Sequence, residues 1–175
     1  MTYDLDAFCH DCRDALKADK GPGGREAVRQ NLERLLAEKA FLDKHVLSMP
    51  PGRHTLHEDP ELGFVVLSHV NTKAAKSPPH DHGASWAIEY TDMTEWRRTK
   101  GDGPGLAEVE IARQYRLDPG HAGTYDIRAI HSIDYPDGAR FVRVTGADLD
   151  RVPRLKFNLQ THEAEIIESV STGPG

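Results

Sequence analysis

Apolar residues near the start of the chain recur with helical spacing. In residues 4–17 they share a single stripe, made up of Leu5, Phe8, Cys9, Cys12 and Leu16, so an amphipathic helix is predicted there. Residues 25–45 repeat the pattern, with leucines near one face and charged side chains between them, which predicts a longer second helix. The glycines and the proline of residues 20–24 predict a loop between the two helices.

From residue 53 onward the pattern changes to that of strands. Residues 107–117 alternate, with Val109, Ile111, Tyr115 and Leu117 on one side, as in a half-buried strand. Shorter strands are predicted over residues 61–70, 141–144, 154–160 and 164–167, separated by turns rich in glycine and proline. This pattern predicts a mainly β sandwich or barrel. We expect residues 1–52 to form a helical segment packed on a barrel of residues 53–170, within a single domain.

Composition narrows the class of protein. With 175 residues, of which 38% are hydrophobic and 29% charged, the chain fits one globular domain. The net charge is -6 and no long cluster of lysine or arginine occurs, so we expect no nucleic-acid partner. No apolar run approaches the length of a membrane span, and the N-terminus lacks a basic region followed by an apolar stretch. We therefore expect a cytoplasmic protein with no membrane partner.

Two cysteines, Cys9 and Cys12, have the spacing of a redox pair. A redox motif of the thioredoxin type opens a helix after a strand, and no strand can precede Cys9. Both cysteines also lie on the apolar stripe of the first helix, so we interpret them as core residues. Histidine, which can bind a metal or take part in catalysis, is more abundant than cysteine, since the chain has ten.

The strongest chemical signal is the pair His80 and His82, which follows two prolines. In an extended strand, side chains two residues apart point to the same face, so the two imidazoles can chelate one divalent ion. A third histidine, His131, lies on a later predicted strand, beyond a Pro-Gly turn. Two surface histidines on an edge strand are the alternative interpretation of the pair.

Four segments together resemble the thiol-dioxygenase branch of the cupin superfamily. They read PPHDHGASWAI, TDMTEW, LDPG and IHSIDYPDGARFVRVTG, and the resemblance covers roughly residues 53–161 together with the preceding helices. It implies a mainly β cupin fold, which is a double-stranded β-helix or jelly-roll barrel, with two N-terminal helices. It also implies Fe(2+) bound by His80, His82 and His131, with O₂ and a thiol at the open positions. Zn(2+) and Ni(2+) are alternative metals, and His121 is an alternative third ligand.

The resemblance further implies a cation that holds a substrate carboxylate. Arg143 and Arg53 are the candidates, and a salt bridge to an acidic residue is the alternative role for each. Trp86 shares the parity of His80 and His82 along the predicted strand, which makes it a candidate for lining the pocket.

The sequence departs from that branch at several points. No glutamate lies four or five residues after His82, and Glu89 faces the opposite side of a regular strand. The cysteine that forms a thioether crosslink in animal cysteine dioxygenases has no counterpart, and Thr145 occupies the place of the catalytic tyrosine. The segment after Trp86 is short, which bears on activity more than on metal binding.

The expected function is therefore that of a mononuclear non-heme iron enzyme that oxidises a small thiol carboxylate to a sulfinate. Another metal-dependent cupin enzyme, such as an isomerase or a hydrolase, is one alternative because fold does not fix function. A non-catalytic cupin that senses a metal or a small molecule is the other. The expected partner is a small-molecule substrate, and a homodimer is compatible with the sequence.

Overall fold

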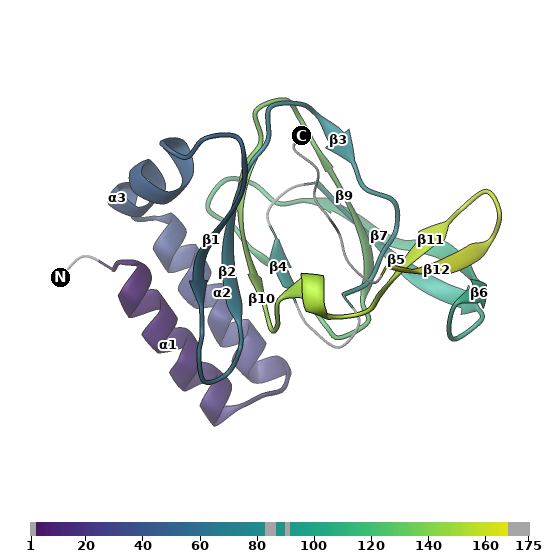
Figure 1. Ribbon diagram of the computed structural model, residues 1–175, viewed down its shortest axis with the longest axis horizontal. Helices are drawn as coiled ribbons and strands as arrows, with labels where there is room; N and C mark the ends of the chain where they lie inside the picture. Colours follow the sequence, from purple (N-terminus) through teal and green to yellow (C-terminus); the bar gives the residue numbers. More distant parts are fainter. Residues whose placement is uncertain (1–2, 83–86, 90–91, 168–175) are drawn as a thin grey trace.

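The N-terminal part of the chain folds into helices that lie on one side of a barrel (Figure 1). The computed structural model describes residues 3–82, 87–89 and 92–167. The helical segments are α1 (Leu5–Ala18), α2 (Pro22–Leu36), α3 (Lys39–Leu42) and the π-helical turn η1 (Asp43–Leu47). Asp4 caps α1 by accepting a hydrogen bond from the N–H of Ala7 at 2.9 Å. The apolar stripe predicted for this helix is buried at Phe8, Cys9, Cys12 and Leu16, and half-buried at Leu5.

The start and the length of the second helix differ from the prediction. Residues 20–24 were predicted as a loop, but α2 already begins at Pro22, where a proline fits the first helical turn. The carboxylate of Asp19 accepts hydrogen bonds from the N–H groups of Gly21 and Gly24. A Cβ atom on Gly24 would lie 1.8 Å from the carbonyl oxygen of Asp19, so glycine permits this close turn. The helix ends at Leu36 rather than continuing to residue 45.

Nine of the strands among the described residues form two antiparallel sheets that face each other, and the other three form a smaller sheet. Their bounds are β1 (Gly52–Glu58), β2 (Val65–Val70), β3 (Ala75–Lys76), β4 (Ala87–Glu89), β5 (Asp92–Lys100), β6 (Gly105–Leu106), β7 (Glu108–Arg116), β8 (Gly123–Tyr125), β9 (Ile130–Tyr135), β10 (Arg140–Thr145), β11 (Arg154–Asn158) and β12 (Glu163–Ile167). One sheet has the order β1-β2-β10-β4-β8, and the other has the order β3-β9-β5-β7. The chain crosses repeatedly between the two sheets, which is the winding of a jelly roll. The predicted fold class, a double-stranded β-helix with N-terminal helices, is confirmed.

Strand β10 shows how one sheet separates two apolar cores. Val142 and Val144 belong to the cluster that includes the buried faces of α1 and α2. Phe141 points the other way, into a cluster between the sheets with Met93, Tyr125 and Ile133. Because side chains alternate along a strand, Arg143 shares the inward face with Phe141. The guanidinium of Arg143 therefore points toward the interior of the barrel.

Strands β11, β12 and β6 form a smaller sheet that projects from the barrel on the side away from the helices (Figure 1). An apolar cluster of Ala107, Ile130, Phe157 and Ala164 joins it to the outer surface of the barrel. No helix among residues 3–82, 87–89 and 92–167 is both long enough and apolar enough to span a membrane.

The single apolar face predicted for residues 107–117 is wrong. The pairing of β5 with β7 shifts register between Glu95 and Trp96, opposite Arg113 and Ile111. Such a bulge rotates the following residues. Tyr115 consequently packs on the cluster inside the barrel, Val109 packs on the outer cluster, and Ile111 is 52% exposed.

One buried carboxylate joins the helices to the barrel. Asp59, in the turn between β1 and β2, accepts hydrogen bonds from the backbone N–H groups of Glu61 and Leu62. It also forms an ion pair with Arg13 of α1, with an Nη2–Oδ2 distance of 2.7 Å. Burial alone would raise the pKa of Asp59, but the hydrogen bonds and the Arg13 guanidinium together hold it below the usual range.

We expect Asp59→Ala to lower the free energy of unfolding by about 3 kcal/mol, because it leaves Arg13 without its buried partner. Asp14→Ala, at an exposed carboxylate of the same helix as Arg13, is the control and should change little. Urea unfolding at pH 7 measures both.

The contribution of Asp59 should also depend on pH in a defined direction. Its folded-state pKa lies below the unfolded value of about 3.9, so its stabilisation is complete above that value. The stabilisation is lost as the pH falls through the folded-state pKa. The gap between the wild type and Asp59→Ala should therefore narrow in acid, and a gap that is constant down to pH 2 would contradict this assignment.

Candidate metal centre

The backbone itself brings two of the predicted ligands together. The N–H of His80 donates to the carbonyl oxygen of His131 at 2.9 Å, and the N–H of His131 donates back to His80 at 2.9 Å. Residues that exchange both hydrogen bonds in this way lie directly opposite each other, with their side chains on the same face. Ser77 continues the pairing along β9, since its N–H donates to Ile133. A segment before β4 is thereby held alongside β9.

The opposite edge of the same segment is held by β11. The N–H of Asp81 donates to the carbonyl oxygen of Leu155, and the carboxylate of Asp81 accepts from the N–H of Leu155, both at 2.9 Å. The N–H of Phe157 donates to Pro79 at 2.8 Å. The segment carrying His80 and His82 is thus fixed on both sides, although it forms only isolated bridges rather than the regular strand that was predicted.

The three imidazoles converge. The nitrogens that His80, His82 and His131 can offer all lie within 4.8 Å of one another. The ring centroid of His131 is 4.7 Å from each of the other two. His131 and His82 are buried at 0% and 2% exposure, and His80 is half-buried. Among the described ranges 3–82, 87–89 and 92–167, no other cluster of histidine, cysteine or carboxylate has this geometry.

The donor set suits a divalent first-row ion. Nδ1 of His80 lies 3.0 Å from the carbonyl oxygen of Pro78. Because a carbonyl only accepts, Nδ1 carries the proton and the lone pair of Nε2 is left for a metal. Two nitrogens that share an ion at about 2.1 Å lie no more than about 4.2 Å apart, so nitrogens as far apart as 4.8 Å would have to approach one another around a bound ion. Neutral imidazoles suit iron, zinc, nickel and copper.

His121, the alternative third ligand, does not join this cluster. It is exposed, and it lies in the turn after Asp118, whose carbonyl oxygen accepts a hydrogen bond from its backbone N–H. The structure therefore brings His131, rather than His121, to the pair His80 and His82.

A hydrogen-bonded chain of side chains adjoins His131. The ring of Tyr125 stacks on that of His131 with centroids 4.6 Å apart. The hydroxyl groups of Tyr125 and Tyr115 are 2.9 Å apart, and Tyr115 donates to the carboxylate of Glu95 at 2.9 Å. Because Tyr115 uses its proton on Glu95, Tyr125 is the donor between the two phenols. Burial raises the pKa of Tyr115 to about 12.

Sequence reasoning placed Tyr115 on an apolar strand face and did not reveal that Tyr115 and Glu95 adjoin the histidine cluster. Glu95 pairs directly across from His131 on β5, and Arg113 of β7 forms an ion pair with its carboxylate at 2.6 Å. This juxtaposition depends on the register of three strands. Spacing along the chain does not reveal that register.

The candidate carboxylate-binding residues lie in different places. Arg143 is half-buried on the inward face of β10, two residues from Phe141. Arg53 lies on β1 at the edge of its sheet and forms a two-pronged ion pair with Asp150. Their hydrogen bonds raise the pKa of Arg53 and lower that of Asp150. Arg53 thus has the salt bridge that was its alternative role. Trp86 lies outside the described residues.

Comparison with known proteins does not assign the chain to a family. No family model matches the sequence, and a search of curated proteins finds no match. Among solved structures, KdgF from Halomonas sp. matches over 59% of this chain and 88% of its own, with 17% identity and a TM-score of 0.39. The Cnp3 cupin domain from Schizosaccharomyces pombe matches over 58% and 66%, with 11% identity and a TM-score of 0.38. A double-stranded β-helix protein from Klebsiella pneumoniae matches over 59% and 83%, with 15% identity and a TM-score of 0.33.

The order of the strands decides the fold. Strands β2, β10, β4 and β8 lie in one sheet and β3, β9, β5 and β7 in the other, which is the interleaved order of an eight-stranded jelly roll. The chain has the cupin fold. Within it, a cluster of three histidines that could hold a metal ion lies between the segment before β4 and strand β9.

We expect His131→Ala and His82→Ala each to weaken metal binding by more than about 100-fold. Changing a residue that only supports a ligand lowers metal affinity by up to about 100-fold, and removing the ligand itself should cost more. His121→Ala is the matched control and should bind like the wild type. The measurement is equilibrium dialysis against Fe(2+) or Zn(2+), followed by elemental analysis of protein without a histidine tag. Full metal occupancy in His131→Ala would show that the third ligand lies elsewhere.

Proposed function

We propose that this protein is a mononuclear non-heme iron dioxygenase that oxidises a small thiol carboxylate to its sulfinate. The observation that carries the proposal is the cluster of His80, His82 and His131, which contains only neutral nitrogen donors. Three neutral ligands would leave a bound Fe(2+) with its full positive charge and with open positions. Such a centre attracts an anionic sulfur ligand. Zn(2+) and Ni(2+) are the competing occupants of the same donor set.

Arg143 is the residue that we assign to the substrate carboxylate. It projects from β10 into the barrel, where Phe141 of the same strand contacts the inner apolar cluster. A guanidinium on this face can hold a carboxylate through two parallel hydrogen bonds. Arg53 is excluded from this role in the proposal because Asp150 already engages its guanidinium from both nitrogens.

The side chains around His131 restrict its motion and exclude water. Tyr125 covers one face of the imidazole and is itself buried, at 2% exposure. Its hydroxyl is fixed by Tyr115 and, through Tyr115, by Glu95. We assign Tyr125 a positioning role. Its ring is fixed by the backbone at one end and by Tyr115 at the hydroxyl, so it would keep the imidazole of His131 from turning away from the cluster.

The reaction balances without a further reductant. One thiol and one O₂ give one sulfinic acid, with both oxygen atoms on sulfur. The iron, when bound, would supply the redox chemistry of O₂, and the protein would supply orientation around two buried histidines, His82 and His131. Arg143 would hold the substrate by its carboxylate and so direct the thiol toward the three histidines.

One observation favours a second candidate, a non-catalytic cupin that binds a metal and a small molecule. Thr145 stands where the dioxygenases that the sequence resembles carry a tyrosine, and it is fully buried on the inward face of β10. Its short side chain cannot place a phenol near the cluster. In this reading the same three histidines would bind the ligand without turning it over.

Iron-loaded protein should consume O₂ with cysteine or 3-mercaptopropionate, and it should do so more slowly with cysteamine, which lacks a carboxylate. The product should contain two atoms of ¹⁸O when the reaction is run under ¹⁸O₂. Oxygen uptake and mass spectrometry make these measurements. If fully iron-loaded protein binds thiols but consumes no O₂, the sensor interpretation replaces the dioxygenase.

Arg143→Met should raise KM for thiol carboxylates by about tenfold or more, since a hydrogen-bonded charge pair is lost, and should leave cysteamine unaffected. Arg140→Met, at an exposed arginine on the same strand, is the matched control. Equal effects of Arg143→Met on cysteamine and on 3-mercaptopropionate would show that Arg143 does not recognise the carboxylate.

A further inference from the structure

A hollow lies outside the barrel, behind the strand that carries His131. It measures about 710 Å³ and is bounded by the loop of residues 101–104, the start of β9 and the smaller sheet of β11 and β12. Ile130 lines this hollow. Because adjacent residues of a strand point to opposite faces, the ring of His131 faces away from it. The volume lies within the range of small-molecule sites.

The walls of this outer cavity combine an apolar surface with arginines. The apolar part includes Trp96, Ile130, Val152, Leu155 and Ile166. The charged part includes Arg98, Arg128 and Arg154, together with the acids Asp81 and Asp102. Asp81 already accepts a hydrogen bond from the N–H of Leu155. The lining therefore carries more cationic than anionic side chains.

Arg154 is the unusual member of this lining. Its residue is 7% exposed, and its Nε and Nη2 atoms have no hydrogen-bond partner among the described residues. A buried guanidinium with unused donors is costly unless an anion or another acceptor neutralises it. Burial lowers the pKa of Arg154, and nearby Arg143 lowers it further, while Asp150 opposes this effect. Arg53 already engages both carboxylate oxygens of Asp150.

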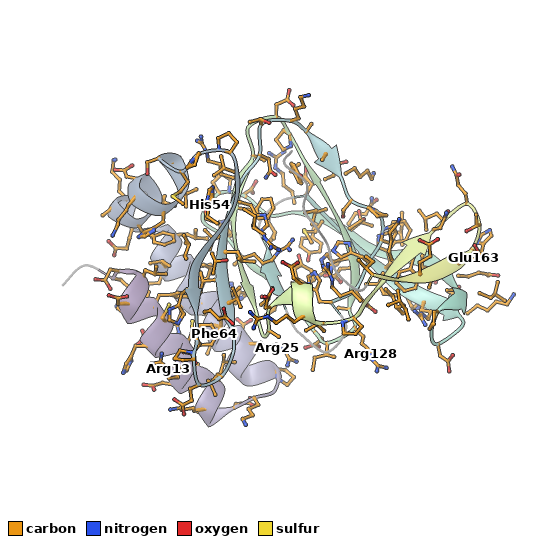
Figure 2. All side chains as sticks on the ribbon, viewed as in Figure 1. Arg13, Arg25, His54, Phe64, Arg128 and Glu163 are labelled. Atoms are coloured by element: carbon orange, nitrogen blue, oxygen red, sulfur yellow. The ribbon has the colours of Figure 1, made fainter. Side chains whose placement is uncertain are left out.

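Arg128 stands at the rim of the same cavity. Figure 2 shows it on the part of the barrel that lies away from the helices. Its side chain is exposed, and its backbone adopts φ 63°, a left-handed conformation that is unfavourable for a residue with a Cβ. Strained backbone of this kind concentrates at functional sites. The guanidinium of Arg98, which also lines the cavity, lies 4.8 Å from the ring centroid of Phe157.

We propose that the outer cavity is a binding site for a small organic anion with an apolar body. Arg154 and Arg128 would hold its carboxylate or phosphate group, and Trp96 and Leu155 would contact the apolar body. The site uses none of the three histidines and does not depend on the proposed iron chemistry. Its ligand need not be the thiol substrate.

The test uses 8-anilinonaphthalene-1-sulfonate, an aromatic anion that fluoresces when bound, with the metal-free full-length protein. We expect saturable binding that Arg154→Gln and Arg128→Gln each weaken by about tenfold, the loss of one charge-assisted contact. Arg151→Gln is the matched control, because Arg151 precedes β11 and is 72% exposed. His131→Ala should bind the dye like the wild type, which separates this cavity from the metal centre.

Competition identifies the chemistry that is recognised. Benzoate, phenyl phosphate or both should displace the dye, and the stronger of the two competitors identifies the preferred head group. Benzyl alcohol, which is uncharged, should not displace it. Unchanged dye affinity in both arginine variants, or equal displacement by benzyl alcohol, would overturn the proposal. If Arg154→Gln does not fold, as judged by its thermal unfolding, Arg128→Gln at the exposed rim decides the question.

Discussion

The reciprocal pair of hydrogen bonds between His80 and His131 is the constraint on which the candidate centre depends. It closes the distance between two segments that are far apart in sequence and places both imidazoles on one face. Hydrogen bonds from Leu155 and Phe157 hold the other edge of the histidine segment. A metal site on a loop would need the ion to organise it. Here the backbone pairing orients two of the three rings before any ion binds.

Each strand of the barrel presents alternate side chains to the interior and to the outer surface. The cupin barrel can therefore carry a polar cluster inside and apolar clusters outside. On β10, Val142 and Val144 pack toward the helices, while Phe141 and Arg143 face the interior. On β9, His131 faces the interior, while Ile130 packs in the outer apolar cluster. A one-residue shift of register would exchange these faces and would remove both the histidine cluster and the apolar core.

Much of this arrangement could be predicted from the sequence, and the failures have physical causes. The stripe that includes Phe8 and Leu16 predicted α1, because helical periodicity is local information. The spacing of His80 and His82 likewise indicated that they act together. The exposure of Ile111 could not be predicted, since it follows from a bulge in the pairing with β5. Glu95 and Tyr115 meet His131 and Tyr125 only through the register of neighbouring strands.

The charges on the two sides of the histidine segment favour anions. Inside the barrel, the three imidazoles and Arg143 carry no negative charge, and the carboxylate of Glu95 is already engaged by Tyr115 and Arg113. Outside, Arg154 is buried with unused donors. Asp81 lies between the two histidines of this segment and lines the outer cavity, so its single negative charge stands between the two positive regions. Its hydrogen bond with Leu155 limits how far that carboxylate can move toward either side. On the two proposals made above, an anionic ligand on each side would balance positive charge that Asp81 cannot offset on both sides at once.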